Sequence, residues 1–228
     1  MKRLATGILS VVLTLALSAA GRPAHAQGLA LGVEGGVNFA RVHVNPDLTG
    51  SDISNRTGVR IAGVLRYDFA GPFGLQTGVA WSQKGAKVAD TSGSGLVEKV
   101  KLDYFQVPLF LTLTIPTGPS PVHPRLFAGP QVGIQSRCNI SATDGTTTVS
   151  AACDSPDLGE GGLMTKKTTF GLAFGGGLDF DTGGPVAITV DGRYELGLTD
   201  INDSGVSTDP SIKNRSFSIS GGLLVKVP

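Results

Sequence analysis

The sequence predicts an all-β protein, a single antiparallel up-and-down transmembrane β-barrel of about eight strands. Three observations predict it: apolar and polar residues alternate along much of the chain, short links alternate with long ones, and glycine is abundant. The chain has 33 glycines among 228 residues, roughly twice average usage. Because these glycines follow no Gly-X-Y period, they favour tightly curved sheets over collagen.

The first 26 residues predict a cleaved signal peptide. A basic start precedes an apolar run at 4–20, and Ala24-His25-Ala26 is a small-x-small pattern that signal peptidase cuts. Cleavage is therefore expected between Ala26 and Gln27, which leaves one outer-membrane barrel domain at 27–228. An uncleaved membrane anchor is the alternative. Beyond residue 27 there is no apolar run of about 18 residues that would predict a transmembrane helix.

The clearest predicted strand is 186–198. Val190, Tyr194 and Leu196 share one face, whereas Asp191, Arg193 and Glu195 share the other. Neighbouring residues in a strand point to opposite faces, so one face is apolar and the other is charged. The same period of two predicts strands at 29–42, 59–69, 73–87, 101–115, 125–136, 170–181 and 214–227.

The links between these strands alternate in length. Short links lie at 70–72, 116–124 and 182–185, and long polar links lie at about 42–56, 88–100, 137–167 and 199–213. Outer-membrane barrels have short periplasmic turns and long outer loops. This segregation therefore predicts that the apolar face points to lipid and that both chain ends lie on the periplasmic side.

Aromatic residues fall beside both kinds of link, as the girdles of a membrane barrel would. Ordinary core aromatics are the alternative interpretation. Those near the short turns are Phe69, Phe73 and Phe180, and those near the long links are Phe39, Trp81, Phe105, Phe170, Tyr194 and Phe217.

Several segments, in order, resemble one family. They are GVEGGVNF at 32–39, LDYFQVPL at 102–109, FAGP at 127–130 and RYELGL at 193–198. They are similar to strands of the outer membrane protein beta-barrel domain family, small porin-like barrels related in architecture to opacity-type proteins. The resemblance implies a fold and an outer-membrane location, but no reaction. The segment GLLVKV at 222–227 resembles the signal read by barrel-insertion machinery, although Pro228 replaces the usual aromatic end.

The charged face of the strands predicts a cluster inside the barrel. A barrel of about eight strands holds side chains but little water, so opposite charges there are expected to pair into a polar plug. A narrow ion path is the alternative. The predicted lumen charges are Glu34, Arg60, Arg66, Asp68, Asp179, Asp191, Arg193 and Glu195, joined by Lys84 and Lys226.

Cys138 and Cys153 are the only cysteines, and both lie in the longest predicted link. The exported compartment is oxidising, so a disulfide between them is expected. It would close a loop of about 15 residues and contribute on the order of 3 kcal/mol in the chain-entropy model.

Other motifs give little support for chemistry. The segment DINDSG at 200–205 is similar to the start of a calcium loop, but Ser211 stands where a bidentate Glu is needed, which favours a solvated loop. The glycines at 175–177 lie within a strand and open no phosphate-binding helix. After signal cleavage only His43 and His123 remain, at opposite barrel ends, so no enzyme, cofactor or metal site is predicted.

The formal net charge of +1 gives no reason to expect nucleic acid as a partner. The sequence predicts an outer-membrane barrel with a structural or interaction role, a plugged polar lumen and long outer loops. Its expected partners are outer-membrane lipid, the barrel-insertion machinery and an extracellular partner that the sequence does not identify. The alternatives are a narrow porin-like channel for small solutes and a soluble secreted barrel that binds an apolar ligand.

Overall fold

The structure is a computed structural model, and it describes residues 28–45, 51–69, 71–90, 96–144, 147–153, 155, 165–201 and 211–227. The predicted signal peptide at 1–26, with its cleavage site at Ala26 and Gln27, lies outside these residues. The structure therefore bears on the predicted barrel domain alone.

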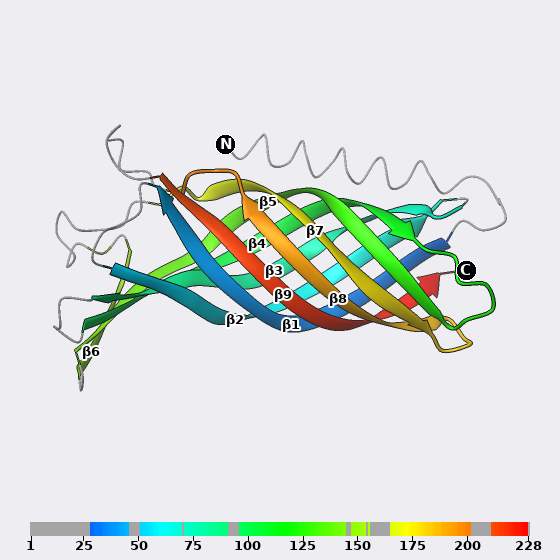
Figure 1. Cartoon of the computed structure of the whole chain (residues 1–228), viewed down its shortest axis with the longest axis horizontal. Coiled ribbons are helices and arrows are strands. Elements are labelled where there is room, and N and C mark those ends of the chain that lie inside the picture. The colour runs from blue at the N-terminus through cyan, green and yellow to red at the C-terminus, as the bar shows by residue number, and fades with distance from the viewer. Residues whose placement is uncertain are drawn as a thin grey trace.

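The described residues form nine β-strands in one antiparallel sheet. The strands are β1 (Gly28–Asn45), β2 (Ser51–Asp68), β3 (Phe73–Asp90), β4 (Leu96–Thr114), β5 (Val122–Asp144), β6 (Thr147–Ala152), β7 (Thr168–Asp181), β8 (Val186–Gly197) and β9 (Ser211–Val227). All except β6 stand side by side around a ring, which the β4–β5 and β1–β9 pairings close (Figure 1). The prediction of an eight-stranded up-and-down barrel is confirmed.

The two ends of the barrel differ in their connections. The first and last strands meet at one end, where Leu29 lies opposite Val227. Tight turns join β2 to β3 and β7 to β8 at this same end, which we call the turn end. The opposite end carries β6, and we call it the hairpin end (Figure 1).

Strands extend further toward the hairpin end than the sequence pattern predicts. β2 begins at Ser51 instead of residue 59, and β3 continues to Asp90. The predicted long links at 42–56 and 88–100 are thus partly strand. Alternation was lost there because these segments are polar on both faces, yet backbone pairing still satisfies their N–H and C=O groups.

The predicted long polar link at 137–167 also contains regular structure. β5 continues to Asp144, and β6 folds back along it with Asn139 opposite Ala152. A hairpin forms here because pairing with a neighbour depends on backbone groups more than on an apolar face. It stands beyond the barrel wall as an extension of β5 (Figure 1).

Successive side chains on the barrel strands point alternately into the lumen and outward. On β8, Val190 is 45% exposed whereas the adjacent Asp191 is 1% exposed. The same contrast separates Ile61 from Arg60 on β2. The apolar rows therefore cover the outside of the barrel, and the charged rows line its interior. No helix in the described part of the chain is long and apolar enough to cross a membrane.

Aromatic side chains gather on the outer face toward the hairpin end. Phe39 lies opposite Phe217, which lies opposite Tyr194, and Trp81 lies opposite Phe105 on the far wall. Near the turn end, Phe73 is half exposed. This placement agrees with two belts of aromatics around an apolar band.

Candidate functional site

The lumen is the candidate functional site because charged and polar side chains from all eight barrel strands converge there. The layer of the lumen nearest the hairpin end is apolar. Leu102 and Tyr104 on β4 pack against Ile201, which follows β8. Asn214 donates a hydrogen bond to the Tyr104 hydroxyl at 3.3 Å, which orients the ring across the lumen.

In the next layer toward the turn end, polar groups from four strands contact one carboxylate. Lys84 on β3 lies 2.5 Å from Glu195 on β8, strands that stand opposite each other across the ring. Gln106 and Gln131 each donate a hydrogen bond to the same Glu195 oxygen at 3.0 Å, and Ser216 donates another at 3.3 Å. The carboxylate is buried but compensated, as a buried charge requires.

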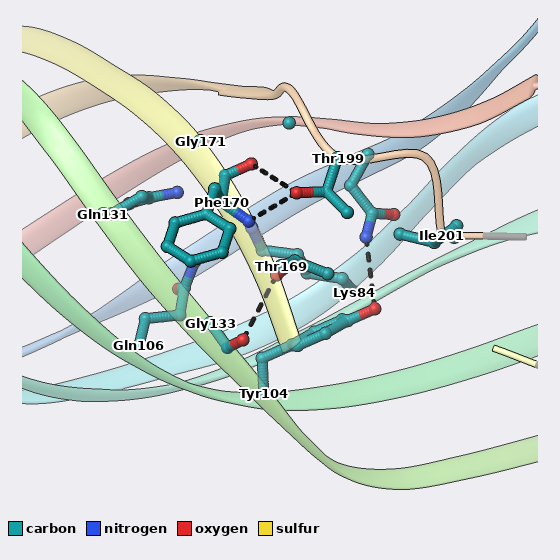
Figure 2. Close-up of a pocket in the computed structure, with 12 residues that line it drawn as sticks. Lys84, Tyr104, Gln106, Gln131, Gly133, Thr169, Phe170, Gly171, Thr199 and Ile201 are labelled. Atoms are coloured by element: carbon teal, nitrogen blue, oxygen red, sulfur yellow. Dashed lines mark hydrogen bonds between the residues drawn. The ribbon is translucent and has the colours of Figure 1, made fainter. Parts of the chain in front are cut away.

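A small cavity adjoins this carboxylate cluster, with a volume of about 20 Å³. Figure 2 shows the residues that line it, which come from β3, β4, β5, β7, β8, β9 and the segment after β8. One water needs roughly 10–15 Å³ by this measure, so the cavity admits a water and no solute.

The middle layer of the lumen combines an ion pair with two aromatic rings. Arg60 on β2 lies 3.4 Å from Glu34 on β1. The guanidinium of Arg193 lies over the rings of Phe110 and Phe127, at 4.8 Å and 5.4 Å from their centroids. Cation–π contact stabilises a cation in a site that excludes water. The strands that carry these rings, β4 and β5, are neighbours in the ring, and only β7 stands between β5 and β8.

The layer nearest the turn end centres on Arg125, whose side chain is fully buried. It lies 2.6 Å from Asp191 and 3.3 Å from Asp179. It also donates hydrogen bonds to Gln76 and Thr189. Arg66 on β2 reaches Asp179 on β7 at 2.6 Å, a second ion pair between strands opposite across the ring.

Some buried polar atoms in these layers have no protein partner within the described residues. They include one carboxylate oxygen each of Glu34, Asp179 and Asp191, and two guanidinium nitrogens of Arg66. Buried polar groups that lack a protein partner usually bond to ordered water. We therefore expect individual waters between the layers.

The structure brings seven of the eight predicted lumen charges into the buried interior: Glu34, Arg60, Arg66, Asp179, Asp191, Arg193 and Glu195. Asp68 is only half buried, at the turn end. Lys84 is inside, whereas Lys226 is exposed at the turn end and pairs with Asp181 at 2.7 Å. Lys226 does point to the inner side, but it lies beyond the closed interior.

Sequence reasoning missed Arg125 and the two inward rings, Phe110 and Phe127. A signal was present, since Arg125, Phe127 and Gln131 alternate with Leu126, Ala128 and Val132. It was obscured because this face carries an aromatic and glycines, so neither face reads as uniformly polar.

A sequence-family model identifies this architecture. The model for the outer membrane protein beta-barrel domain matches residues 22–203. The chain belongs to this family. Membership places the protein in the bacterial outer membrane, so its outward apolar rows face lipid. No curated protein matches the chain in sequence.

Three solved structures are similar to this chain, and the first of them, with a TM-score above 0.5, shows the same fold. OprG from Pseudomonas aeruginosa is 15% identical, with a TM-score of 0.54, and the match covers 88% of this chain and 96% of OprG. Neisserial surface protein A is 16% identical, with a TM-score of 0.46 and coverage of 87% and 99%. A major outer membrane protein from Thermus thermophilus is 14% identical, with a TM-score of 0.48 and coverage of 87% and 99%.

Membership of this family argues against the alternative hypothesis of a soluble secreted barrel that carries an apolar ligand. Such a carrier needs an apolar interior and a polar exterior. This outer-membrane barrel has Val190 and Leu178 outside and Asp191 and Asp179 inside, which is the reverse.

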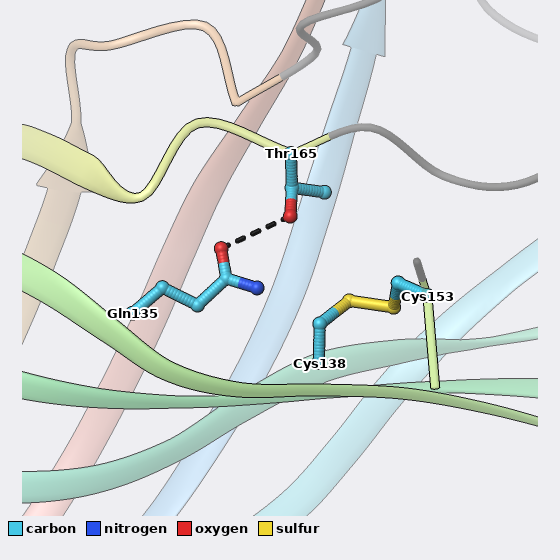
Figure 3. The surroundings of a disulfide bond; sticks show 4 residues. All are labelled: Gln135, Cys138, Cys153 and Thr165. Atoms are coloured by element: carbon cyan, nitrogen blue, oxygen red, sulfur yellow. Dashed lines mark hydrogen bonds between the residues drawn. A yellow bond between two sulfur atoms is a disulfide. The ribbon is translucent and has the colours of Figure 1, made fainter. Parts of the chain in front are cut away.

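The predicted disulfide is confirmed: Cys138 on β5 is bonded to Cys153, just after β6 (Figure 3). It ties the β5–β6 hairpin at its base. Beside it, Thr165 donates a hydrogen bond to Gln135 at 3.0 Å, which fastens the returning chain to β5 (Figure 3). The outer-membrane barrel thus carries a covalently pinned hairpin at its hairpin end.

The remaining candidate residues stay apart. His43 lies on the outer face at the hairpin end, and His123 lies at the turn end, 3.3 Å from Asp181. In the calcium-like segment, Asp200 accepts a hydrogen bond from the Ile212 amide at 2.9 Å, and residues 202–205 lie outside the described part of the chain.

Glycine on β7 makes room for the lumen network, and this gives a testable expectation. A Cβ at Gly177 would overlap the Asp191 carboxylate and lie 2.7 Å from the Val190 carbonyl oxygen. We expect Gly177→Ala to lower the free energy of unfolding by about 1–3 kcal/mol, as overpacking does. Urea titration of barrel folded in lipid vesicles measures it.

Gly63→Ala on β2 is the matched control for Gly177→Ala, because nothing lies within 4 Å of a Cβ there. Its urea midpoint should stay close to that of the unmodified protein. Equal midpoints for both variants would show that the space beside Asp191 is not limiting.

Proposed function

We propose that the protein is a non-catalytic and non-conducting outer-membrane barrel with a structural or interaction role. Its lumen is closed by its own side chains, and its hairpin end engages a partner outside the cell. The observation that carries closure is the pair of salt bridges between opposite strands, Lys84–Glu195 and Arg66–Asp179.

Closure is supported at every level of the lumen. The apolar layer of Leu102, Tyr104 and Ile201 lies at the hairpin end. Arg193 and two aromatic rings occupy the middle, and Arg125 with its carboxylates occupies the turn end. Small barrels of about eight strands have interiors just wide enough for side chains, so this filling leaves no continuous water column.

An interaction role is supported by the hairpin that stands beyond the barrel wall. β6 is exposed along most of its length, and within the described residues it pairs with β5 alone. Its free edge presents backbone N–H and C=O groups, which can pair with a strand of another protein. The disulfide at Cys138 and Cys153 would keep that edge in a fixed geometry.

A non-catalytic role is supported by the separation of the two histidines. His43 and His123 lie at opposite ends of the barrel, so they cannot share a substrate. A general base must lie within hydrogen-bond reach of the proton it takes.

Planar-bilayer recording tests this proposal. We expect purified, folded protein to give no unitary current steps, because the ion pairs that cross the lumen leave no hydrated path. A large open porin in the same bilayers is the positive control. Reproducible, ion-selective steps from this protein would instead establish the alternative, a narrow channel for small solutes.

A further inference from the structure

Basic side chains lie opposite one another on the outer face of the barrel. In the β1–β9 ladder, Arg41 lies directly opposite Arg215, and His43 lies directly opposite Lys213. All four side chains are exposed. Like charges directly opposite on a sheet are destabilising, so the Arg41–Arg215 pair calls for a compensating anion.

The residues that the structure describes supply no such anion to the arginines. Within the described residues, neither Arg41 nor Arg215 forms an ion pair, in contrast to the lumen, where every acidic side chain of the network has a basic partner. The compensating charge must come from outside the described part of the chain.

The position of Arg41 and Arg215 on the barrel wall indicates where the compensating anion comes from. Arg41 and Arg215 are two residues beyond the aromatic pair Phe39 and Phe217, on the same outward face. Below that pair the ladder is apolar, with Val37 opposite Ile219. Aromatic side chains mark the membrane interface, so the arginines stand at the level of lipid headgroups.

A groove joins the basic and aromatic groups. It has a volume of about 620 Å³ and is lined by Phe39, Arg41, His43, Tyr194, Arg215 and Phe217, among others. Aromatic walls suit the apolar part of a lipid, and paired guanidinium groups suit phosphate, which arginine binds in a bidentate manner.

We propose that this groove binds a phosphate-bearing lipid of the outer leaflet, with the phosphate between Arg41 and Arg215 and the acyl chains along Phe39 and Phe217. This site goes beyond the role proposed for the lumen and the hairpin. It does not depend on whether the barrel conducts.

The far wall offers a matched control. Lys87 on β3 lies opposite Lys99 on β4, also outward, but six residues beyond the aromatic pair Trp81 and Phe105. At about 3.3 Å per residue this places the lysines on the order of 20 Å further along the strand, beyond the headgroups. The two lysines therefore carry the same charge as the two arginines but lie at a different level relative to the membrane.

The test uses folded protein in phosphatidylcholine bicelles titrated with lipid A, and native mass spectrometry counts retained lipid. We expect Arg41→Gln/Arg215→Gln to weaken lipid A binding by about thirtyfold, since each of the two basic groups near a membrane surface contributes about 1 kcal/mol. Lys87→Gln/Lys99→Gln should bind like the unmodified protein. Heat-modifiable gel mobility verifies that each variant is folded.

Three outcomes would overturn the proposal. One is lipid A retention by the arginine variant within twofold of the unmodified protein. Another is an equal loss in the lysine variant, which would mean that net charge alone attracts the lipid. The third is full displacement of lipid A by inorganic phosphate, which would show that the site selects a free anion. Retention of lipid A against inorganic phosphate, lost only in the arginine variant, supports the groove.

Discussion

Replacing Arg125 with methionine is expected to lower the free energy of unfolding by about 3–5 kcal/mol, the range seen when one partner of a buried ion pair is removed. Arg125 is fully buried and reaches both Asp191 and Asp179. Methionine fills much of its volume but leaves Asp191 without a cation in contact. Equilibrium unfolding in urea, with the barrel folded in lipid vesicles, measures the loss.

Lys226→Met is the control for Arg125→Met because it also replaces the basic partner of an ion pair with methionine. The Lys226 side chain is 53% exposed, and its partner Asp181 is about a third exposed. An exposed pair contributes about 0–1 kcal/mol, so this variant should unfold close to the unmodified protein. Similar losses in the two variants would mean that burial of the Arg125 cluster does not govern its contribution.

The period-two pattern of the sequence was sufficient to predict the barrel and its orientation. On β8, Asp191, Arg193 and Glu195 alternate with Val190, Tyr194 and Leu196, and this alternation survives because the two faces meet different solvents. The pattern fails where both faces of a strand carry polar residues. For that reason β6 and the outer extensions of β2 and β3 were read as links.

The partners of the lumen charges could not be predicted from the sequence. Lys84 and Glu195 are 111 residues apart, and they meet because β3 and β8 stand opposite each other in the closed ring. That meeting depends on the stagger between strands, which single-strand alternation does not encode. By contrast, the Cys138–Cys153 bond was predictable because no other cysteine competes.

The contacts across the lumen and the apolar rows on the outside both determine which face of each strand points outward. A substitution in the outer rows is the second change for which we expect a large effect. Val190 on β8 points outward, between Leu178 on β7 and Gly221 on β9. We expect Val190→Arg to lower the free energy of unfolding from lipid vesicles by about 2–4 kcal/mol, the cost of a basic side chain at the bilayer midplane.

Val149→Arg separates a membrane effect from a general effect of adding charge. Val149 is 66% exposed on β6, in the hairpin that stands beyond the barrel wall, so its arginine stays in water. Its unfolding free energy should match that of the unmodified protein, whereas the Val190 variant should be destabilised only when the barrel is surrounded by bilayer. If Val190→Arg were as well tolerated as Val149→Arg in vesicles, the outer rows of β8 would not face hydrocarbon. That result would also remove our explanation for the ionic interior. Charged side chains lie inside this barrel because hydrocarbon around its outer face excludes them.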